Sequence, residues 1–176
     1  MKIGIAAVLA VAALALGGCV DTIPIEYAPS STLSAAGTVK VGDFNYLPTT
    51  QGKMKPNQIH NTALGNVLLD KNIDVFFRNA VFTELRFVGV KVGDGDKTLT
   101  GDIREFLIDD LGYSVDWTID VDYKVTDTGG KVIYESDKSA KNRTSKFSNA
   151  LGALTQQMKL NIESLIQDPG FIKAIH

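Results

Sequence analysis

The chain has 176 residues, with 18 Lys and Arg against 20 Asp and Glu, and a net charge of −2. This mild acidity excludes the clustered basic surface of a nucleic-acid-binding protein. It also argues against spreading on anionic lipid headgroups. The only cysteine is Cys19, so no disulfide can form within the chain and a packed core must stabilise the domain.

The first residues have the layout of a secretory signal peptide. Lys2 supplies a short positive region, residues 3–16 are almost entirely apolar, and two glycines precede Cys19. The apolar run is shorter than the ~20 residues that a membrane-spanning helix needs. An ordinary signal peptide, with Cys19 at its end by chance, is one interpretation of these residues.

The tetrad Leu16-Gly17-Gly18-Cys19 resembles the bacterial lipobox, which favours a second interpretation. The resemblance implies cleavage between Gly18 and Cys19 and lipid, with palmitate among its acyl chains, on the cysteine. Several acyl chains are enough for stable anchoring. Val20 stands where aspartate commonly marks inner-membrane retention in Gram-negative bacteria. We therefore expect an outer-membrane lipoprotein that faces the periplasm, with the cell surface as the alternative.

Three parts of the chain are expected. Residues 1–18 form the cleaved signal, and residues 19–36 form the lipidated cysteine with a flexible tether rich in proline and serine. Residues 37–176 form a single α+β periplasmic domain, a length that suits one core.

In the first half of the domain, residues 38–46 are expected to form a strand, 47–61 a polar loop and 62–69 a short strand. Asp70–Asn72 offers capping residues before a helix that ends at Gly89. A strand at 90–92 and a turn at 93–96 come next. The helix has one apolar face, widened by Phe76, Phe82 and Phe87, which comprises Ile73, Phe77, Ala80, Val81, Leu85 and Val88.

The strongest pattern runs from Tyr113 to Val125, where apolar residues occupy every second position and polar residues the others. Such alternation predicts a strand with one buried face. Trp117, in the middle of the apolar phase, is expected to face the helices. Residues 99–108 and 131–138 are expected to flank this strand in a three-stranded antiparallel meander.

The last element is a helix capped by Thr144 or Ser145 and ended by Asp168-Pro169. A short apolar tail with Phe171 is expected to pack back on the domain. The order of elements predicts a mainly antiparallel sheet with two helices packed on one face, an α+β fold. The apolar face of this helix comprises Phe147, Leu151, Leu154, Met158, Ile162 and Leu165.

The chain resembles the YajG-like family of uncharacterised Gram-negative outer-membrane lipoproteins. The resemblance rests on Lys71-Asn72-Ile73 leading into the helix that ends at Gly89, on residues 98–129, and on the final helix with its Asp168 ending. It also extends to envelope lipoproteins that serve as auxiliary subunits of transport machines. Either group implies a fold and a compartment, with no reaction and no functional residue to carry over.

Candidate chemistry is sparse, so we expect no enzyme, no metal and no cofactor. His60 and His176 are the only histidines and have no converging ligands or orienting partner in sequence. The Gly93–Asp96 stretch suits a turn better than a calcium loop. Residues 142–144 match a glycosylation acceptor but suit a helix cap in a bacterial chain.

Asp116, Asp120 and Asp122 share the polar face of the long strand. They form either a solvated face that discourages edge pairing or an acidic docking face for another protein. We therefore expect an accessory or interaction protein of an outer-membrane or transport assembly, with other envelope proteins as partners. The alternative is a binding module for a lipid or small hydrophobic ligand, suggested by the phenylalanines of the first helix.

Overall fold

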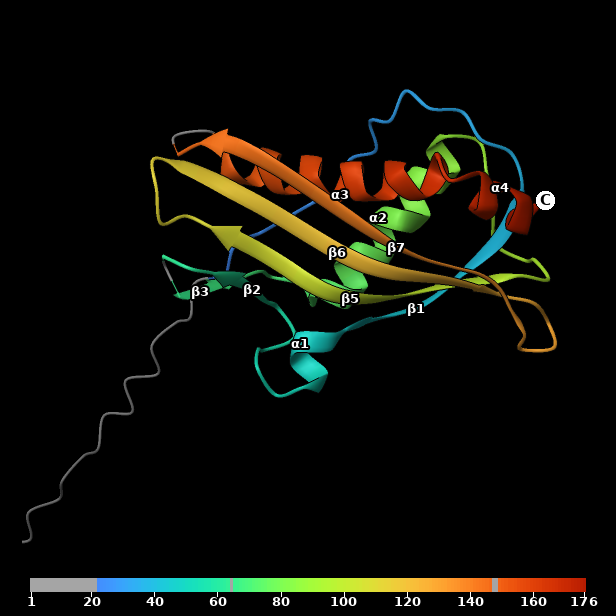
Figure 1. Ribbon diagram of the computed structural model, residues 1–176, viewed down its shortest axis with the longest axis horizontal. Helices are drawn as coiled ribbons and strands as arrows, with labels where there is room; N and C mark the ends of the chain where they lie inside the picture. The colour runs from blue at the N-terminus through green and yellow to red at the C-terminus, as the bar shows by residue number, and fades with distance from the viewer. Residues whose placement is uncertain (1–21, 64, 147–148) are drawn as a thin grey trace, which may run out of the picture.

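The computed structural model describes residues 22–63, 65–146 and 149–176. Seven strands form one sheet, and four helices accompany them in this part of the chain (Figure 1). In chain order the elements are β1 (Thr38–Tyr46), α1 (Leu47–Thr50), β2 (Gln58–Asn61), β3 (Gly65–Leu68), α2 (Ile73–Phe87), β4 (Lys91–Val92), β5 (Thr98–Asp109), β6 (Ser114–Thr126), β7 (Val132–Ser145), α3 (Ala150–Ile166) and α4 (Pro169–Ile175).

The sheet is mixed, so the prediction of a mainly antiparallel sheet is wrong. The meander of β5, β6 and β7 is antiparallel as expected. On the other side of β5, however, β1 and β2 both pair with it in parallel. The chain passes from β1 to β5 through α2, and a helical crossover is the connection that parallel neighbours require. The position of α2 between two strands therefore already favoured parallel pairing.

Strands β1 and β2 lie in line along the same edge of β5. β1 pairs with its first half, where Lys40 aligns with Thr98, and β2 pairs near its end, where His60 aligns with Leu107. The residues between them, expected to be a loop, include the short helix α1, which begins at Leu47 and has Pro48 in its first turn. A proline there costs no hydrogen bond.

Helices α2, α3 and α4 cover one face of the sheet. α2 packs over β1, α3 packs over β6 and β7, and the two helices contact each other. The fourth helix, α4, is the expected apolar tail, and it packs back on the domain through the fully buried side chain of Phe171. The expectation of two helices is therefore wrong in number, because α1 and α4 are additional short helices.

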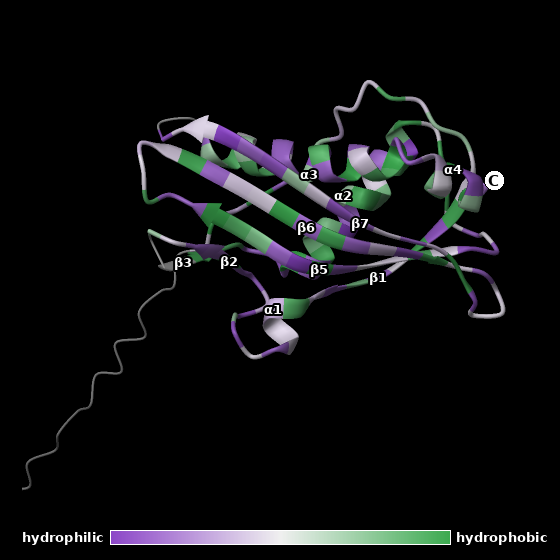
Figure 2. Cartoon of the chain, in the orientation of Figure 1, coloured by the Kyte–Doolittle hydropathy of each residue, from purple (hydrophilic) through white to green (hydrophobic). Residues whose placement is uncertain are grey.

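The alternation predicted for the long strand is confirmed from Val115 to Val125, where every second side chain is buried. Figure 2 shows the resulting alternation of hydrophobic and hydrophilic residues along β6. Tyr113 is an exception, because it precedes the strand and is fully exposed. A pattern of period two does not reveal where the strand begins.

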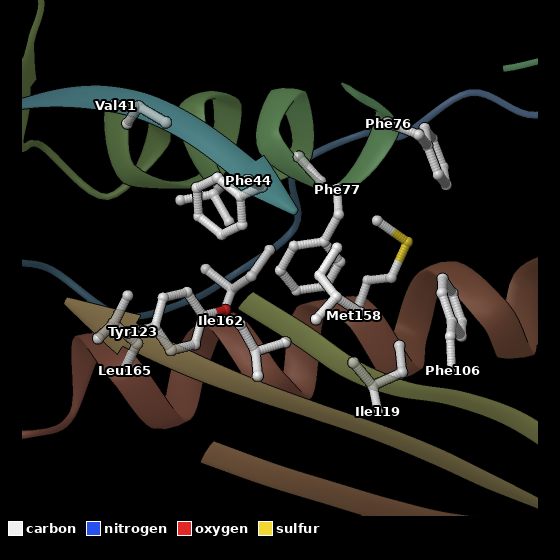
Figure 3. Close-up of a cluster of buried hydrophobic side chains, with 14 of the residues drawn as sticks. Val41, Phe44, Phe76, Phe77, Phe106, Ile119, Tyr123, Met158, Ile162 and Leu165 are labelled. Atoms are coloured by element: carbon white, nitrogen blue, oxygen red, sulfur yellow. The ribbon is translucent and has the colours of Figure 1, made fainter. Parts of the chain in front are cut away.

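Aromatic and aliphatic side chains from the sheet and the two long helices meet in one core (Figure 3). The Phe44 ring lies 5.9 Å from that of Phe77 and 6.0 Å from that of Tyr123, measured between centroids. These contacts join β1, α2 and β6. The phenylalanines of the first helix are not all internal, since Phe87 is 56% exposed at the helix end.

Helix α3 begins later than expected. Asn149 is the N-cap residue, and its side chain accepts a hydrogen bond from the Gly152 amide. Residues 142–145, expected to cap the helix, instead extend β7 alongside β6. Within the predicted apolar face Leu151 is 40% exposed, whereas Leu154, Met158, Ile162 and Leu165 are buried. Phe147 lies outside the described residues.

One buried polar residue fixes α3 on the sheet. Asn161 is fully buried, and its side-chain amide donates to the carbonyl oxygens of Ile119 and Lys138, at 3.0 and 2.8 Å. Its oxygen accepts a 2.8 Å hydrogen bond from the hydroxyl of Tyr123. Buried polar groups are tolerated when they are satisfied in this way, and the geometry then specifies one position of the helix.

The N-terminal segment, defined as residues 22–36, is packed on the domain, unlike the flexible tether that was expected. Ile23 forms a parallel β-bridge with Leu69, and Ile25 is buried. Further along, the Ala35 amide donates to the carbonyl of Val88, beyond the end of α2. Prolines and serines favour irregular backbone, but apolar residues between them give this segment a surface to bury.

Candidate functional site

An apolar cavity of about 170 Å³ lies where the N-terminal segment enters the domain. Its wall combines the start of α3, the end of β5, the start of β6, the end of β7 and the β2–β3 hairpin. Small-molecule sites usually measure about 300–1,000 Å³, so this cavity is small for an enclosed lipid. The apolar side chains in the wall are Ile23, Ile59, Val67, Leu69, Ile108, Val115, Trp117, Leu151 and Leu154.

Trp117 faces this cavity and the helices, as predicted from the alternation. Its side chain is 4% exposed, and its indole nitrogen donates to Thr144 Oγ1 at 2.9 Å. A buried tryptophan needs such an acceptor, because an unsatisfied N–H inside a core is costly. The partner lies on β7, in a stretch that the sequence suggested as a helix cap.

A buried carboxylate holds the N-terminal segment against α2. Glu84 is fully buried and accepts hydrogen bonds from the Tyr27 hydroxyl at 2.6 Å and from the Ser31 amide at 2.7 Å. The Ser31 hydroxyl donates in turn to Glu163 of α3 at 2.6 Å. Burial and the nearby Glu84 carboxylate raise the pKa of Tyr27, so this phenol stays a donor at any physiological pH. Sequence reasoning missed this cluster, because its members are far apart in the chain.

The sheet face opposite the helices, which we term the open face, carries the three aspartates singled out in the sequence. Arg143 donates two hydrogen bonds to Asp116, at 2.6 and 2.7 Å, and lowers the pKa of that carboxyl. Arg104 lies 3.4 Å from Asp122 and also pairs with Asp137. Asp120 faces Ser139 across the β6–β7 ladder.

Carboxylates outnumber cations on the open face, even with these ion pairs. Strand register and exposure place the side chains of all three strands of the meander there. Acidic and basic side chains are therefore mixed on this face, with an excess of acidic ones. Such a surface suits protein contact more than it suits catalysis. Its acidic residues are Asp102, Glu105, Asp109, Asp116, Asp120, Asp122, Glu135 and Asp137, and its basic residues are Arg104, Lys124, Lys141 and Arg143.

The two histidines lie far apart in the chain. His60 is in β2 rather than in the expected loop, and its Nδ1 is 3.4 Å from Glu105 Oε1. His176 is the exposed terminal residue. Among residues 22–63, 65–146 and 149–176, no three His, Cys, Asp or Glu side chains are grouped as a metal site requires. The Gly93–Asp96 stretch forms bends between β4 and β5.

Gly18 and Cys19, the expected cleavage and lipidation residues, lie outside the described part of the chain. No helix within that part is both long and apolar enough to cross a bilayer.

Asp168 lies at the end of the domain opposite the cavity and joins three parts of the fold. It caps α4 through the Gly170 amide, accepts from the Tyr134 hydroxyl at 2.8 Å and pairs with Lys138 at 2.6 Å. The hydrogen bond from Lys138 is the main cause that lowers its pKa to about 2, from an ordinary 3.8. The carboxylate therefore ties β7 to α4.

Asp168→Asn is expected to destabilise the domain by about 2 kcal/mol at neutral pH, from 1.4 kcal/mol per pKa unit. Asparagine keeps the capping acceptor, so the change removes chiefly the charge. Because the folded-state pKa is depressed, the contribution is complete above pH 4 and disappears as pH falls through about 2. Urea unfolding of both proteins across this range measures it, and a difference independent of pH would contradict the assignment.

No protein-family model matches the chain, and no curated protein matches its sequence. Its fold is similar to that of protein XCC0632 from Xanthomonas campestris, of the family model DUF330, with a TM-score of 0.67, 13% identity and coverage of 87% of this chain and 96% of that one. Protein CT253 from Chlamydia trachomatis has a TM-score of 0.54, 13% identity and coverage of 80% and 99%. An uncharacterized protein has a TM-score of 0.55 at 13% identity, with coverage of 84% and 98%. At these identities the likeness establishes a shared fold.

Proposed function

We propose that the chain is a lipoprotein of the bacterial envelope, cleaved before Cys19 and anchored by lipid on that residue. The observation that carries the proposal is the tetrad Leu16-Gly17-Gly18-Cys19, which places the only cysteine of the chain after an apolar run and two glycines. Val20 favours the outer membrane, and the YajG-like resemblance agrees with that compartment. We place the anchored domain on the periplasmic side of that membrane.

Cys19→Ser is expected to abolish metabolic labelling with a fatty-acid analogue, because no other thiol exists in the chain. The precursor should also keep its signal peptide, which mass spectrometry of the purified protein measures. Val20→Ser, next to the lipidation residue, serves as the control and should retain the label. Persistent labelling of the Cys19→Ser protein would refute the lipid anchor.

The domain acts through contact with other envelope proteins and has no catalytic role in this proposal. The open face supports it, because its acidic excess lies on a rigid sheet and stays partly exposed. Arginines hold Asp116 and Asp122 in place, so a partner meets fixed carboxylates. A partner surface with excess lysine and arginine fits this face by charge.

A photo-crosslinking residue at Thr118, in the middle of the open face, is expected to capture an envelope protein in living cells. The matched control is Asn79, an exposed residue of α2 on the other side of the domain. Lys substitution of both Asp120 and Asp122 should weaken capture severalfold by reversing the local charge. Equal products from Thr118 and Asn79 would remove the open face as the docking surface.

The lipid-binding alternative is favoured by one observation, the apolar cavity at the end of the sheet. Its volume of about 170 Å³ accommodates part of one acyl chain rather than a whole lipid. Phe76 and Phe77, which suggested this alternative, belong to the packed core. Protein contact is therefore the function that the geometry supports better.

A further inference from the structure

Large apolar side chains are exposed at the turn between β5 and β6. Leu111 is 74% exposed and Tyr113 is 102% exposed, the two highest values among the exposed large apolar residues of the described chain. Single exposed apolar residues are common on protein surfaces, but two in one four-residue turn indicate a surface that contacts another molecule.

The turn is braced by its neighbours. The Asp110 amide donates to Thr62 Oγ1 at 3.0 Å, and Thr62 Oγ1 donates to Asp109 at 2.8 Å. Lys146 lies 3.1 Å from the Asp110 carboxylate and also donates to the carbonyl of Gly112. These bonds attach the turn to β2 and to the end of β7, so it presents Leu111 and Tyr113 from a fixed position.

The N-terminal segment enters the domain at the same end. Ile23, which is 37% exposed, shares the cavity wall with Asp110 and with the 40% exposed Leu151. Figure 1 shows the β5–β6 turn, the β2–β3 hairpin and the start of α3 together at one end, with the C-terminus at the other. Four of the large exposed apolar residues therefore lie around the entry point of the chain, namely Ile23, Leu111, Tyr113 and Leu151.

The distance from this end to the lipid anchor is short. Ile23 is hydrogen-bonded to the backbone of Leu68 and Asp70, and only four peptide units separate it from Cys19. A chain of that length spans at most about 14 Å. Headgroup regions are about 6 Å thick on each side of a bilayer, taken from its total and hydrocarbon thickness. A cysteine held there by lipid keeps Ile23 close to the membrane surface.

We propose that these four residues, called the membrane edge, rest in the interface of the lipid bilayer. The inference depends on the proposed lipidation of Cys19. Tyrosine suits the interface because its ring is apolar and its hydroxyl stays hydrated. Leu111 and Leu151 reach the acyl-chain boundary, as apolar residues of interfacial anchors do. The contact is apolar, so it requires no excess of basic residues.

The proposed contact fixes the orientation of the domain. The opposite end, with the β6–β7 turn and the C-terminus, points away from the bilayer (Figure 1). The open face is then steeply inclined to the membrane plane and does not rest on the bilayer. Another envelope protein can therefore approach it. Anchoring and docking thereby use different surfaces of the domain.

The test uses the mature lipidated protein in vesicles of phosphatidylethanolamine and phosphatidylglycerol that contain doxyl-labelled lipid. An environment-sensitive fluorophore is attached to Leu111→Cys, and as the matched control to Thr128→Cys in the exposed turn at the far end. Lipid on Cys19 leaves the introduced cysteine as the free thiol. We expect severalfold stronger doxyl quenching at position 111 than at position 128, and weaker quenching there by aqueous iodide.

Mass spectrometry of the same samples reports acylation of Cys19 separately. Equal quenching at the two positions in acylated protein would overturn the membrane edge and leave the lipoprotein proposal intact. That result would also be found if the edge instead bound another protein, since the vesicles contain none. Absence of acyl groups on Cys19 would overturn the lipoprotein proposal, and the inference with it.

Discussion

Trp117→Ala is expected to lower the free energy of unfolding by about 3–5 kcal/mol, as removal of a buried tryptophan usually does. The side chain is 4% exposed and lines the apolar cavity together with Ile59 and Leu154. Its loss enlarges a cavity that already exists, and it leaves the Thr144 hydroxyl without its donor. Urea unfolding of residues 20–176, followed by circular dichroism, measures the change.

Asp116→Asn is the matched control, one position away on the opposite face of β6. Its carboxylate is exposed and pairs with Arg143, and exposed ion pairs contribute little to stability. The control should therefore unfold at nearly the wild-type urea concentration. A severely destabilised Asp116→Asn beside a nearly unaffected Trp117→Ala would place the strand in the opposite phase.

Strand β6 could be predicted because its signal is local and repeated. The apolar residues from Val115 to Val125 all follow the same period of two, and a single buried face accounts for all of them. Helix α2 has the same advantage, with a periodic face from Ile73 to Leu85 and Gly89 at positive φ beyond its end. Its last residues were less predictable, since burial of Phe87 depends on what lies opposite the helix end.

The pairing of β1 with β5 could not be obtained from periodicity. Their alternation predicts that each is a strand with a buried face, and it does not specify the direction or identity of the neighbour. The helix between them was the usable signal. The meander was easier because tight turns impose antiparallel neighbours, as at Asp127, whose side chain accepts from the Gly129 and Lys131 amides.

The contacts of the N-terminal segment were not predictable from its composition. Prolines and serines indicated a tether, but Ile25 is buried and Tyr27 reaches Glu84. A glutamate on a helix is usually solvated, so only the folded arrangement identifies Glu84 as an internal acceptor. The open face was predicted in part. The alternation along the strand placed Asp116 on it correctly, but it could not identify Arg143 of the neighbouring strand as the partner of Asp116.

Glu84→Ala is expected to release residues 27–35 of the N-terminal segment and to cost about 3 kcal/mol, because it leaves buried donors without an acceptor. The affected donors are the Tyr27 hydroxyl and the amides of Ser30 and Ser31. Release of the segment into water limits the cost. Urea unfolding gives the free energy, and hydrogen exchange of the amides of residues 30–35 should accelerate by at least tenfold.

Glu26→Ala is the control for that experiment, since its side chain is in the same segment but is 89% exposed and pairs with the Lys71 ammonium at the surface. It should leave both measurements nearly unchanged. If Glu84→Ala also leaves amide exchange unchanged, the carboxylate does not hold the segment. If exchange accelerates as expected, residues 30–35 are released while Ile23 stays hydrogen-bonded to Leu68 and Asp70. The link between Cys19 and the domain then remains short, so the shielding expected at Leu111 in vesicles should persist.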